Sequence, residues 1–201
     1  MNSESIPEYK IILASNSSIR QKILEDSGIS FEVVPSEVEE EELKQSLSGN
    51  NFREYCLTLA KAKALDVSNK KKNAYVIGSD QICSYGEEIF SKPLTKENCF
   101  KTLSKLSGNT HYQNCGISIC KNGKEIWSHY AQAALTMKSL SDREIRDYID
   151  KDEPFMACGA YRFESLGKNL FLTTKGDETT IQGLTLNPII NFLTSKKVIN
   201  L

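Results

Sequence analysis

The dipeptide Asn122-Gly123 separates two strand-like segments, residues 111–120 and 125–137. Asn-Gly is the strongest short-range signal for a β-hairpin, because both residues accept the positive φ angles of a tight turn. The two segments therefore predict antiparallel neighbouring strands. Strand-like and helical segments alternate along the rest of the chain. We therefore predict an α/β fold, in which a mixed, partly antiparallel, twisted sheet is flanked by helices.

Local signals place the other elements. Ser17 or Ser18 is the expected N-cap of a helix that stops near Gly28, and Ser141-Asp-Arg-Glu144 has the form of a capping box. The acidic run of residues 37–42 predicts a solvated connection. Apolar runs predict strands over residues 9–14, 31–34, 74–78 and 171–174, and helical periodicity predicts helices over residues 51–66 and 95–105 and from Asn187 onward, with Pro188 at the first helical position.

Composition limits the classes of partner. The 201 residues carry a net charge of −1, so a nucleic-acid surface would need a local basic patch. We expect a single domain, residues 1–201, because 39% of the residues are apolar and the length suits one core. No apolar stretch approaches the roughly 20 residues of a membrane span. The first ten residues lack the pattern of a secretory signal. We therefore predict a cytoplasmic protein without membrane or nucleic-acid partners, and six reduced, packed cysteines.

The segment Leu13-Ala-Ser-Asn-Ser-Ser-Ile-Arg20 passes from a strand into a helix. The N–H groups at such a helix start attract anions, and the hydroxyls of Ser15 and Ser17 add donors. Arg20 lies in the first turn, where a cation is disfavoured unless something negative faces it. The segment suits an anion, but serine capping beside a surface arginine explains it as well.

Two lysines and two carboxylates add further candidates. Lys63 continues an apolar helix stripe and must either extend to solvent or meet an anion. Asp80 follows a short apolar strand, and the carboxyl ends of such strands are common ligand sites. Lys92 can bring a cation to the same edge, and Glu164 lies in a glycine-bounded aromatic segment. Each residue also has a purely structural explanation, whereas a polyphosphate with a divalent metal accounts for all of them together.

The order of these motifs resembles one family. The motifs that carry the resemblance are Leu13-Ala-Ser-x-Ser-x-x-Arg20, Glu40, Lys63, Gly78-Ser-Asp-Gln81, Lys92-Pro93, Leu106-Ser-Gly-x-Thr-His111, Gly159-Ala-Tyr161 and Gly183-Leu184. From about residue 11 to 195 the chain is similar to the Maf family of nucleoside triphosphate pyrophosphatases. The resemblance implies a Maf/Ham1-like fold of two lobes with a central cleft, commonly as a homodimer.

The resemblance also implies a reaction. A nucleoside triphosphate is hydrolysed to the monophosphate and pyrophosphate with a divalent cation, Mg²⁺ or alternatively Mn²⁺ or Co²⁺. Asp80 matches the proposed proton acceptor, and with Glu40 it is the expected metal ligand. The phosphate-binding positions match Ser15, Arg20, Lys63 and Lys92, to which the helix start adds Ser17.

Three residues bear on the base. Gln81 and Glu164 match the branch of the family that acts on 7-methyl-GTP, and Trp127-x-His129 and Gly176-Asp177 resemble its alphaproteobacterial members. A carboxylate at Glu164 attracts the positive ring of 7-methylguanine, and Gln81 can donate to the base oxygen O6. Ile19 stands where this branch often has tryptophan. We therefore predict a house-cleaning enzyme for modified nucleotides.

Other functions remain open at this stage. A dTTP- or UTP-preferring pyrophosphatase differs only in its base contacts. A catalytically weak nucleotide-binding regulator of cell division would keep the fold and lose turnover. An RNA-binding module is disfavoured by the near-neutral charge and by the lack of an aromatic and basic stripe.

Overall fold

The structure is a computed structural model that describes residues 10–47 and 51–200, apart from the side chains of residues 45 and 46. A seven-stranded sheet has the order β2-β1-β3-β5-β6-β7, and β4 pairs with β3 outside that path. β1 runs parallel to β2 and β3, whereas the other pairs are antiparallel. This mixed sheet confirms the predicted fold class. The strands are β1 Lys10–Leu13, β2 Glu32–Val33, β3 Ala74–Tyr85, β4 Glu88–Phe90, β5 Thr110–Lys121, β6 Lys124–Met137 and β7 Phe171–Lys175.

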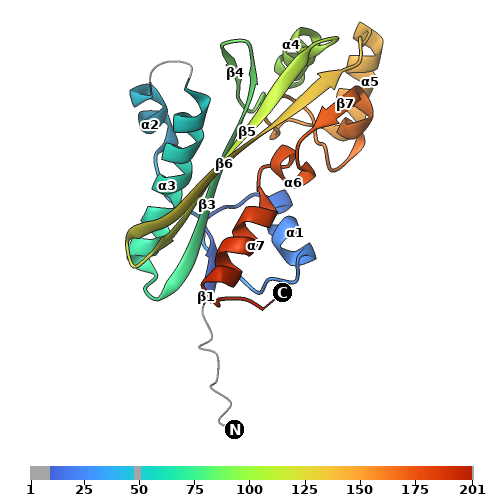
Figure 1. Ribbon diagram of the computed structural model, residues 1–201. Coiled ribbons are helices and arrows are strands. Elements are labelled where there is room, and N and C mark those ends of the chain that lie inside the picture. Colours follow the sequence, from blue (N-terminus) through green and yellow to red (C-terminus); the bar gives the residue numbers. More distant parts are fainter. Residues whose placement is uncertain (1–9, 48–50, 201) are drawn as a thin grey trace.

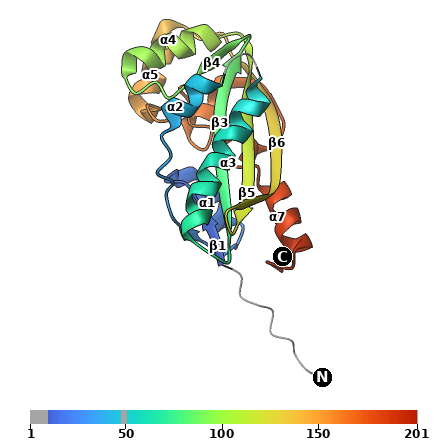
Figure 2. The same cartoon turned by 90° about the vertical axis from the view of Figure 1, so that its left-hand side faces the viewer.

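Helices cover both faces of the sheet (Figure 1). One face carries α3, which crosses β3 and β5, and the view from its side in Figure 2 shows α3 in front of these strands. α1, α6 and α7 lie on the other side, and α4 and α5 lie together at one end. The helices are α1 Ser18–Asp26, α2 Glu40–Ser46, α3 Phe52–Lys70, α4 Lys96–Leu106, α5 Asp142–Asp152, the 3₁₀ helix η1 Leu166–Leu170, α6 Glu178–Ile181 and α7 Leu186–Ser195.

The predicted hairpin is confirmed by β5 and β6. Asn122 has a φ of 53° and Gly123 a φ of 76°, which are the positive values that the tight turn requires. The two strands pair from Thr110↔Thr136 to Lys121↔Lys124. The hairpin therefore forms the longest run of paired residues in the sheet.

β3 is longer than the sequence predicts. The expectation was a short strand that ends at Gly78, with Asp80 just beyond its carboxyl end, and this expectation is wrong. β3 continues to Tyr85 because its partner β5 offers unbroken pairing from Val76↔Cys120 to Ser84↔Tyr112. Asp80 therefore lies in the middle of a strand.

The middle of β3 has an unpaired edge on its other side. Pairing with β1 ends at Leu13↔Ile77, and pairing with β4 starts at Cys83↔Phe90. No strand of the described chain pairs with residues 78–82 on that edge. The backbone groups on this edge can therefore bond to side chains or to a ligand. The sequence predicted a place for a ligand at the end of a short strand, and the structure has these free backbone groups in the middle of a long one.

Other element boundaries also differ. The acidic run is a solvated connection only in part, because α2 begins at Glu40 and places carboxylates in its first turn, where the helix dipole favours them. α3 extends to Lys70 instead of ending at residue 66. α7 begins at Leu186, so Pro188 is the third helical residue and not the first. The capping box at Ser141 is confirmed, and residue 9 of the predicted first strand lies outside the described residues.

The six cysteines are free thiols, and all but Cys158 are buried, as predicted. Within the described residues, no helix has both the length and the apolar character of a membrane span.

Two glycines allow α3 to pack closely on the sheet. A Cβ atom on Gly78 would lie 2.2 Å from the carbonyl oxygen of Ala60, and one on Gly116 would lie 2.5 Å from the carbonyl carbon of Cys56. Both contacts are with helix backbone, which cannot turn away as a flexible side chain can. The close packing matters for function because α3 also carries Lys63.

We expect Gly78→Ala to lower the free energy of unfolding by about 2 kcal/mol, since the added methyl overpacks the contact between β3 and α3. Urea denaturation measures this loss. Ser128→Ala, at an exposed position of β6, is the control, and we expect a change within about 0.5 kcal/mol. A Gly78→Ala protein as stable as the wild type would show that α3 is not held by this contact.

Candidate functional site

Lys63 joins two carboxylates at the centre of the candidate site. Its Nζ lies 2.7 Å from Asp80 Oδ1 and 2.9 Å from Glu40 Oε1. Lys63 comes from the sheet-facing side of α3, Asp80 from β3 and Glu40 from the start of α2. Of the two alternatives for Lys63, the structure therefore shows the one in which it meets anions.

Burial sets the ionisation of this cluster. Asp80 is 7% exposed, and burial raises the pKa of its carboxyl above the ordinary value, against the opposing attraction of Lys63 and Arg20. Burial also acts to raise the pKa of Glu40, but the attraction of Lys63, Lys44 and Lys92 outweighs it and leaves that pKa below its ordinary value. The two carboxylates therefore have pKa values shifted in opposite directions, which is a feature of acid–base sites.

The start of α1 supplies a second part of the site. Ser17 occupies the N-cap position, but its side chain makes no capping hydrogen bond, and its backbone N–H donates to Ser15 Oγ at 3.2 Å. Arg20 Nη1 donates to Ser15 Oγ at 3.3 Å and to the carbonyl oxygen of Ser79 at 3.0 Å. The oxygen atoms around its guanidinium explain how Arg20 is tolerated at a helix start.

The unpaired edge of β3 connects these parts. The carbonyl oxygen of Ser79 accepts from Arg20, and the carbonyl oxygen of Gln81 accepts from Cys158 Sγ at 3.6 Å. Lys92 is exposed, and its charge acts on the pKa values of both Glu40 and Cys158. Side chains from α1, α3 and the segment after α5 therefore contact residues 79–81, and the charge of Lys92 acts on two of their neighbours.

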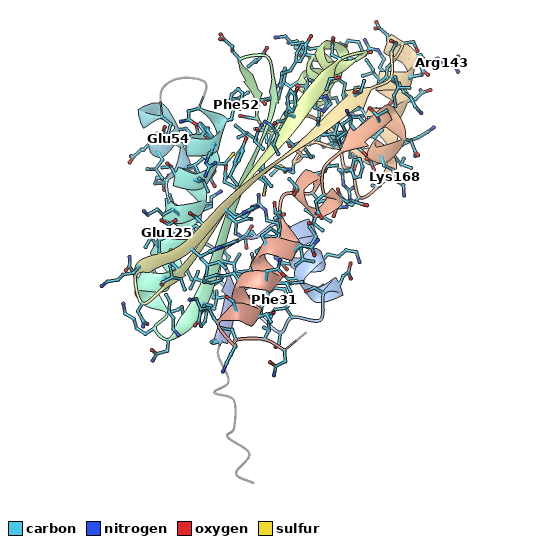
Figure 3. The ribbon with its side chains drawn as sticks, in the orientation of Figure 1. Phe31, Phe52, Glu54, Glu125, Arg143 and Lys168 are labelled. Atoms are coloured by element: carbon cyan, nitrogen blue, oxygen red, sulfur yellow. The ribbon has the colours of Figure 1, made fainter. Side chains whose placement is uncertain are left out.

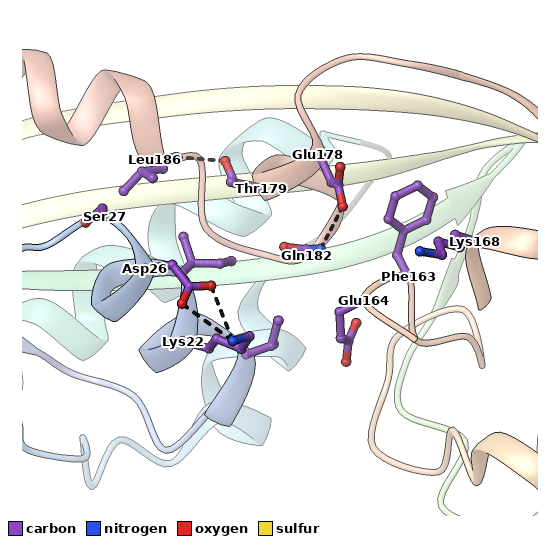
Figure 4. A pocket seen from close by; sticks show the side chains of 12 residues that line it. Lys22, Asp26, Ser27, Phe163, Glu164, Lys168, Glu178, Thr179, Gln182 and Leu186 are labelled. Atoms are coloured by element: carbon purple, nitrogen blue, oxygen red, sulfur yellow. Dashed lines mark hydrogen bonds and ion pairs between the residues drawn. The ribbon is translucent and has the colours of Figure 1, made fainter. Parts of the chain in front are cut away.

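A pocket of about 420 Å³ lies between α1, η1, α6 and the start of α7 (Figure 4), and none of its lining residues in the described chain comes from β3. Ile19 and Glu164, two of the three residues expected at the base, line it. Phe163, Lys168 and Gln182 also line it, and Figure 4 shows the Phe163 ring close to Lys168. The volume falls within the range of small-molecule sites.

Glu164 has a charged neighbour at the rim of the pocket. Arg162 Nε lies 3.4 Å from Glu164 Oε1, and Arg162 Nη1 also donates to the backbone oxygen of Asp152 at 3.3 Å. The Glu164 side chain is 26% exposed. The negative charge of the Glu164 carboxylate is thus partly balanced by Arg162, and a ligand can still reach this carboxylate.

Gln81 is placed differently from the expectation. Its Nε2 donates to the carbonyl oxygens of Thr180 at 3.1 Å and Ile181 at 2.7 Å. A carboxamide nitrogen carries only two hydrogens, so in this structure both are used by α6. A donor bond from Gln81 to a base is therefore not available in this arrangement.

The structure thus brings Ser15, Arg20, Glu40, Lys63 and Asp80 around one edge of β3, and places Ile19 and Glu164 in the pocket between α1, η1 and α6. Sequence reasoning missed Phe163, Lys168 and Gln182, and it missed the part played by α6. The signals for this region were the aromatic segment around Glu164 and the family motifs Gly176-Asp177 and Gly183-Leu184, which flank α6. α6 has four residues, which is too short for a helical periodicity to appear.

The oxygen donors present suit a hard divalent cation. Mg²⁺ in proteins is typically held by one or two carboxylates together with substrate phosphates, and Glu40 and Asp80 are two such carboxylates on either side of one cationic group. The described residues contain no cluster of three or more His, Cys, Asp or Glu side chains that could hold a metal. A metal at this place would therefore depend on oxygens that the substrate brings.

A family model described as Maf-like protein matches residues 10–196. The chain belongs to the Maf family. A nucleoside triphosphate pyrophosphatase of Legionella pneumophila (strain Corby) is 40% identical over 199 residues, which cover 99% of this chain and 100% of that protein. A 7-methyl-GTP pyrophosphatase of Brucella abortus biovar 1 (strain 9-941) is 38% identical over 195 residues, or 95% of this chain and 98% of that protein.

Among solved structures, the Ham1 protein of Staphylococcus aureus matches with a TM-score of 0.46 at 15% identity, covering 93% of this chain and 99% of that one. The Maf assignment rests on the sequence match, and the fold class on the strand order of this chain itself.

Proposed function

We propose that this Maf protein is a nucleoside triphosphate pyrophosphatase that removes modified nucleotides. Water attacks the α-phosphorus, the bond between that phosphorus and the oxygen bridging to the β-phosphate breaks, and the products are a nucleoside monophosphate and pyrophosphate. The observation that carries the proposal is the contact of the buried Lys63 with the buried Asp80 and the half-exposed Glu40, beside Arg20 and the start of α1. Such a cluster supplies a base and several cations for a charged leaving group.

Each polar residue has a role in this reaction. Asp80 orients the attacking water and accepts its proton, since the raised pKa of its carboxyl makes it a better base than an exposed aspartate. Lys63, Arg20 and Lys92, with Ser15, Ser17 and the N–H groups of α1, stabilise the negative charge of the pyrophosphate. A divalent cation, Mg²⁺ or alternatively Mn²⁺ or Co²⁺, held by Glu40, Asp80 and phosphate oxygens, would supply further charge neutralisation.

We assign the nucleobase to the pocket lined by Ile19 and Glu164. Ile19 of the pocket precedes Arg20 in α1, and Arg20 donates to the carbonyl oxygen of Ser79, so a base in the pocket would direct the triphosphate toward Arg20 and β3. The carboxylate of Glu164 favours a base that is positively charged, as 7-methylguanine is. The name of the relative from Brucella abortus supports the same preference.

A nucleotide panel tests this function. We expect pyrophosphate release with a divalent cation, and a higher kcat/KM for 7-methyl-GTP and GTP than for UTP or dTTP. Glu164→Gln keeps the shape and removes the charge, so we expect it to lower kcat/KM for 7-methyl-GTP about tenfold and for GTP much less. GTP measured with the same variant is the control.

The other outcomes are informative too. A higher kcat/KM for UTP or dTTP would point to the alternative substrate class. Nucleotide binding without pyrophosphate release would favour the catalytically weak regulator of cell division. We also propose a cytoplasmic homodimer without nucleic-acid or membrane partners, for which size-exclusion chromatography with light scattering is the first measurement.

A further inference from the structure

The side-chain nitrogen of Gln81 is held by a segment distant from it in the sequence. Its Nε2 donates to the carbonyls of Thr180 and Ile181, and a Cβ atom added to Gly183 would lie 3.0 Å from its Oε1. The carbonyls of the last turn of a helix lack partners within the helix. Gln81 therefore acts as a side-chain cap for the short helix α6.

The same segment is held at two more points. The carbonyl oxygen of Gly183 accepts from Ser79 Oγ at 2.8 Å and from Arg20 Nε at 2.8 Å. Side chains alternate between the two faces of a strand, so Ser79 and Gln81 share one face of β3. Asp80 points to the opposite face, where Lys63 of α3 meets it. A residue directly after Asp80 therefore faces away from the carboxylate cluster and toward α6.

α6 forms one wall of the pocket. The pocket is lined on this side by Glu178 and Thr179 of the helix and by Gln182 just after it. Among the described residues that line the pocket, Gln81 does not occur. Gln182 Nε2 lies 3.2 Å from Glu178 Oε1, a contact that Figure 4 draws along this wall. A displacement of α6 would thus change the shape of the pocket without any change in its lining side chains.

We infer that Gln81 is a positioning residue, which keeps the base pocket in shape by holding α6 against β3 and not by contacting the base. The inference rests on the proposed function, because it concerns the pocket assigned to the base. A threonine at this position is shorter by two atoms and cannot reach both carbonyls. The residue after Asp80 can therefore alter the shape of the pocket through the position of α6, without lining the pocket itself.

The test uses Gln81→Met, which keeps the length of the side chain and removes its hydrogen-bond donors. Gln81→Thr is the second variant and takes its place if the methionine variant does not fold. We expect kcat/KM for GTP and for ATP to fall by the same factor, about tenfold, mainly through a higher KM. A direct bond from Gln81 to O6 predicts a loss for GTP and none for ATP, whose base carries an amino group there. A simple loss of folded protein predicts a lower kcat at unchanged KM.

Amide hydrogen exchange provides a readout that needs no substrate. We expect residues 180–183 to exchange about tenfold faster in either variant, while β5 is unchanged. Unchanged exchange in that segment, or a loss confined to GTP, overturns the inference. If the wild type releases no pyrophosphate, the proposed function fails by itself, and the exchange result still decides whether Gln81 holds α6.

Discussion

Asp80→Asn is expected to reduce kcat at least about 10²-fold, because the amide keeps the shape of the side chain but cannot accept the proton of the attacking water. The water must then lose its proton to solvent, which is a poorer and unpositioned base. Pyrophosphate release under saturating nucleotide measures the loss. KM should change far less, since Arg20 and the pocket remain in place.

The pH profile identifies the role more closely. Burial raises the pKa of Asp80, so kcat/KM of the wild type should rise with pH through that pKa, and the variant should lack this rise. Asp150→Asn is the matched control, because Asp150 is exposed and pairs with Lys96 on the surface; its turnover should stay within about twofold of the wild type. Near-normal turnover by Asp80→Asn would remove the assignment of Asp80 as the base.

Lys63→Met is expected to affect both activity and stability. The substitution leaves the carboxylates of Asp80 and Glu40 without their shared cation, and removal of one partner from a buried ion pair typically costs about 3 kcal/mol or more. We expect a loss of that size in the free energy of unfolding near pH 8, measured by urea denaturation. Pyrophosphate release should also fall strongly, because the proposed reaction uses the charge of Lys63 to stabilise the pyrophosphate.

The stability loss should depend on pH in a defined direction. Without Lys63 the pKa of Asp80 rises further above its value in the unfolded chain. A carboxyl with a raised pKa in the folded state destabilises the fold when it is ionised, and this penalty disappears as the pH falls through the raised pKa. The gap between the variant and the wild type should therefore narrow from pH 8 to pH 5.

Lys61→Met is the control for this pair of measurements. Lys61 also lies on α3, but its side chain is 49% exposed and pairs with Glu125 of β6 at 3.0 Å. Figure 3 labels Glu125. Exposed ion pairs contribute less than about 1 kcal/mol, so we expect little loss at either pH. Equal effects of the two substitutions would contradict a special role for the buried cation.

Local signals predicted much of this fold. The Asn-Gly turn and the capping box at Ser141 act over a few residues, and both were predicted and are confirmed. The length of β3 was not predictable in this way, because Gly78-Ser-Asp-Gln81 is polar and resembles a strand end. Its strand conformation comes from pairing with β5, about 35 residues later along the chain.

In the candidate site, too, the residues were predictable from local signals and their contacts were not. Residue type and position along a helix or strand singled out Arg20, Lys63 and Asp80 one at a time, and the family motifs grouped them. Their contacts could not be predicted, since Lys63 meets Asp80 only because α3 packs on β3 through Gly78. The partners of Gln81 are 99 and 100 residues away, so no local pattern could indicate that this side chain holds α6.

The length of β3 has a mechanical consequence. A strand of 12 residues spans about 40 Å, so β3 passes from β1 at one end of the molecule to β4 at the other without a break. Asp80 therefore lies on a continuous strand that is paired with β5, and not on a flexible loop. A movement of the surrounding helices toward a ligand would thus leave Asp80 at a fixed position in the sheet.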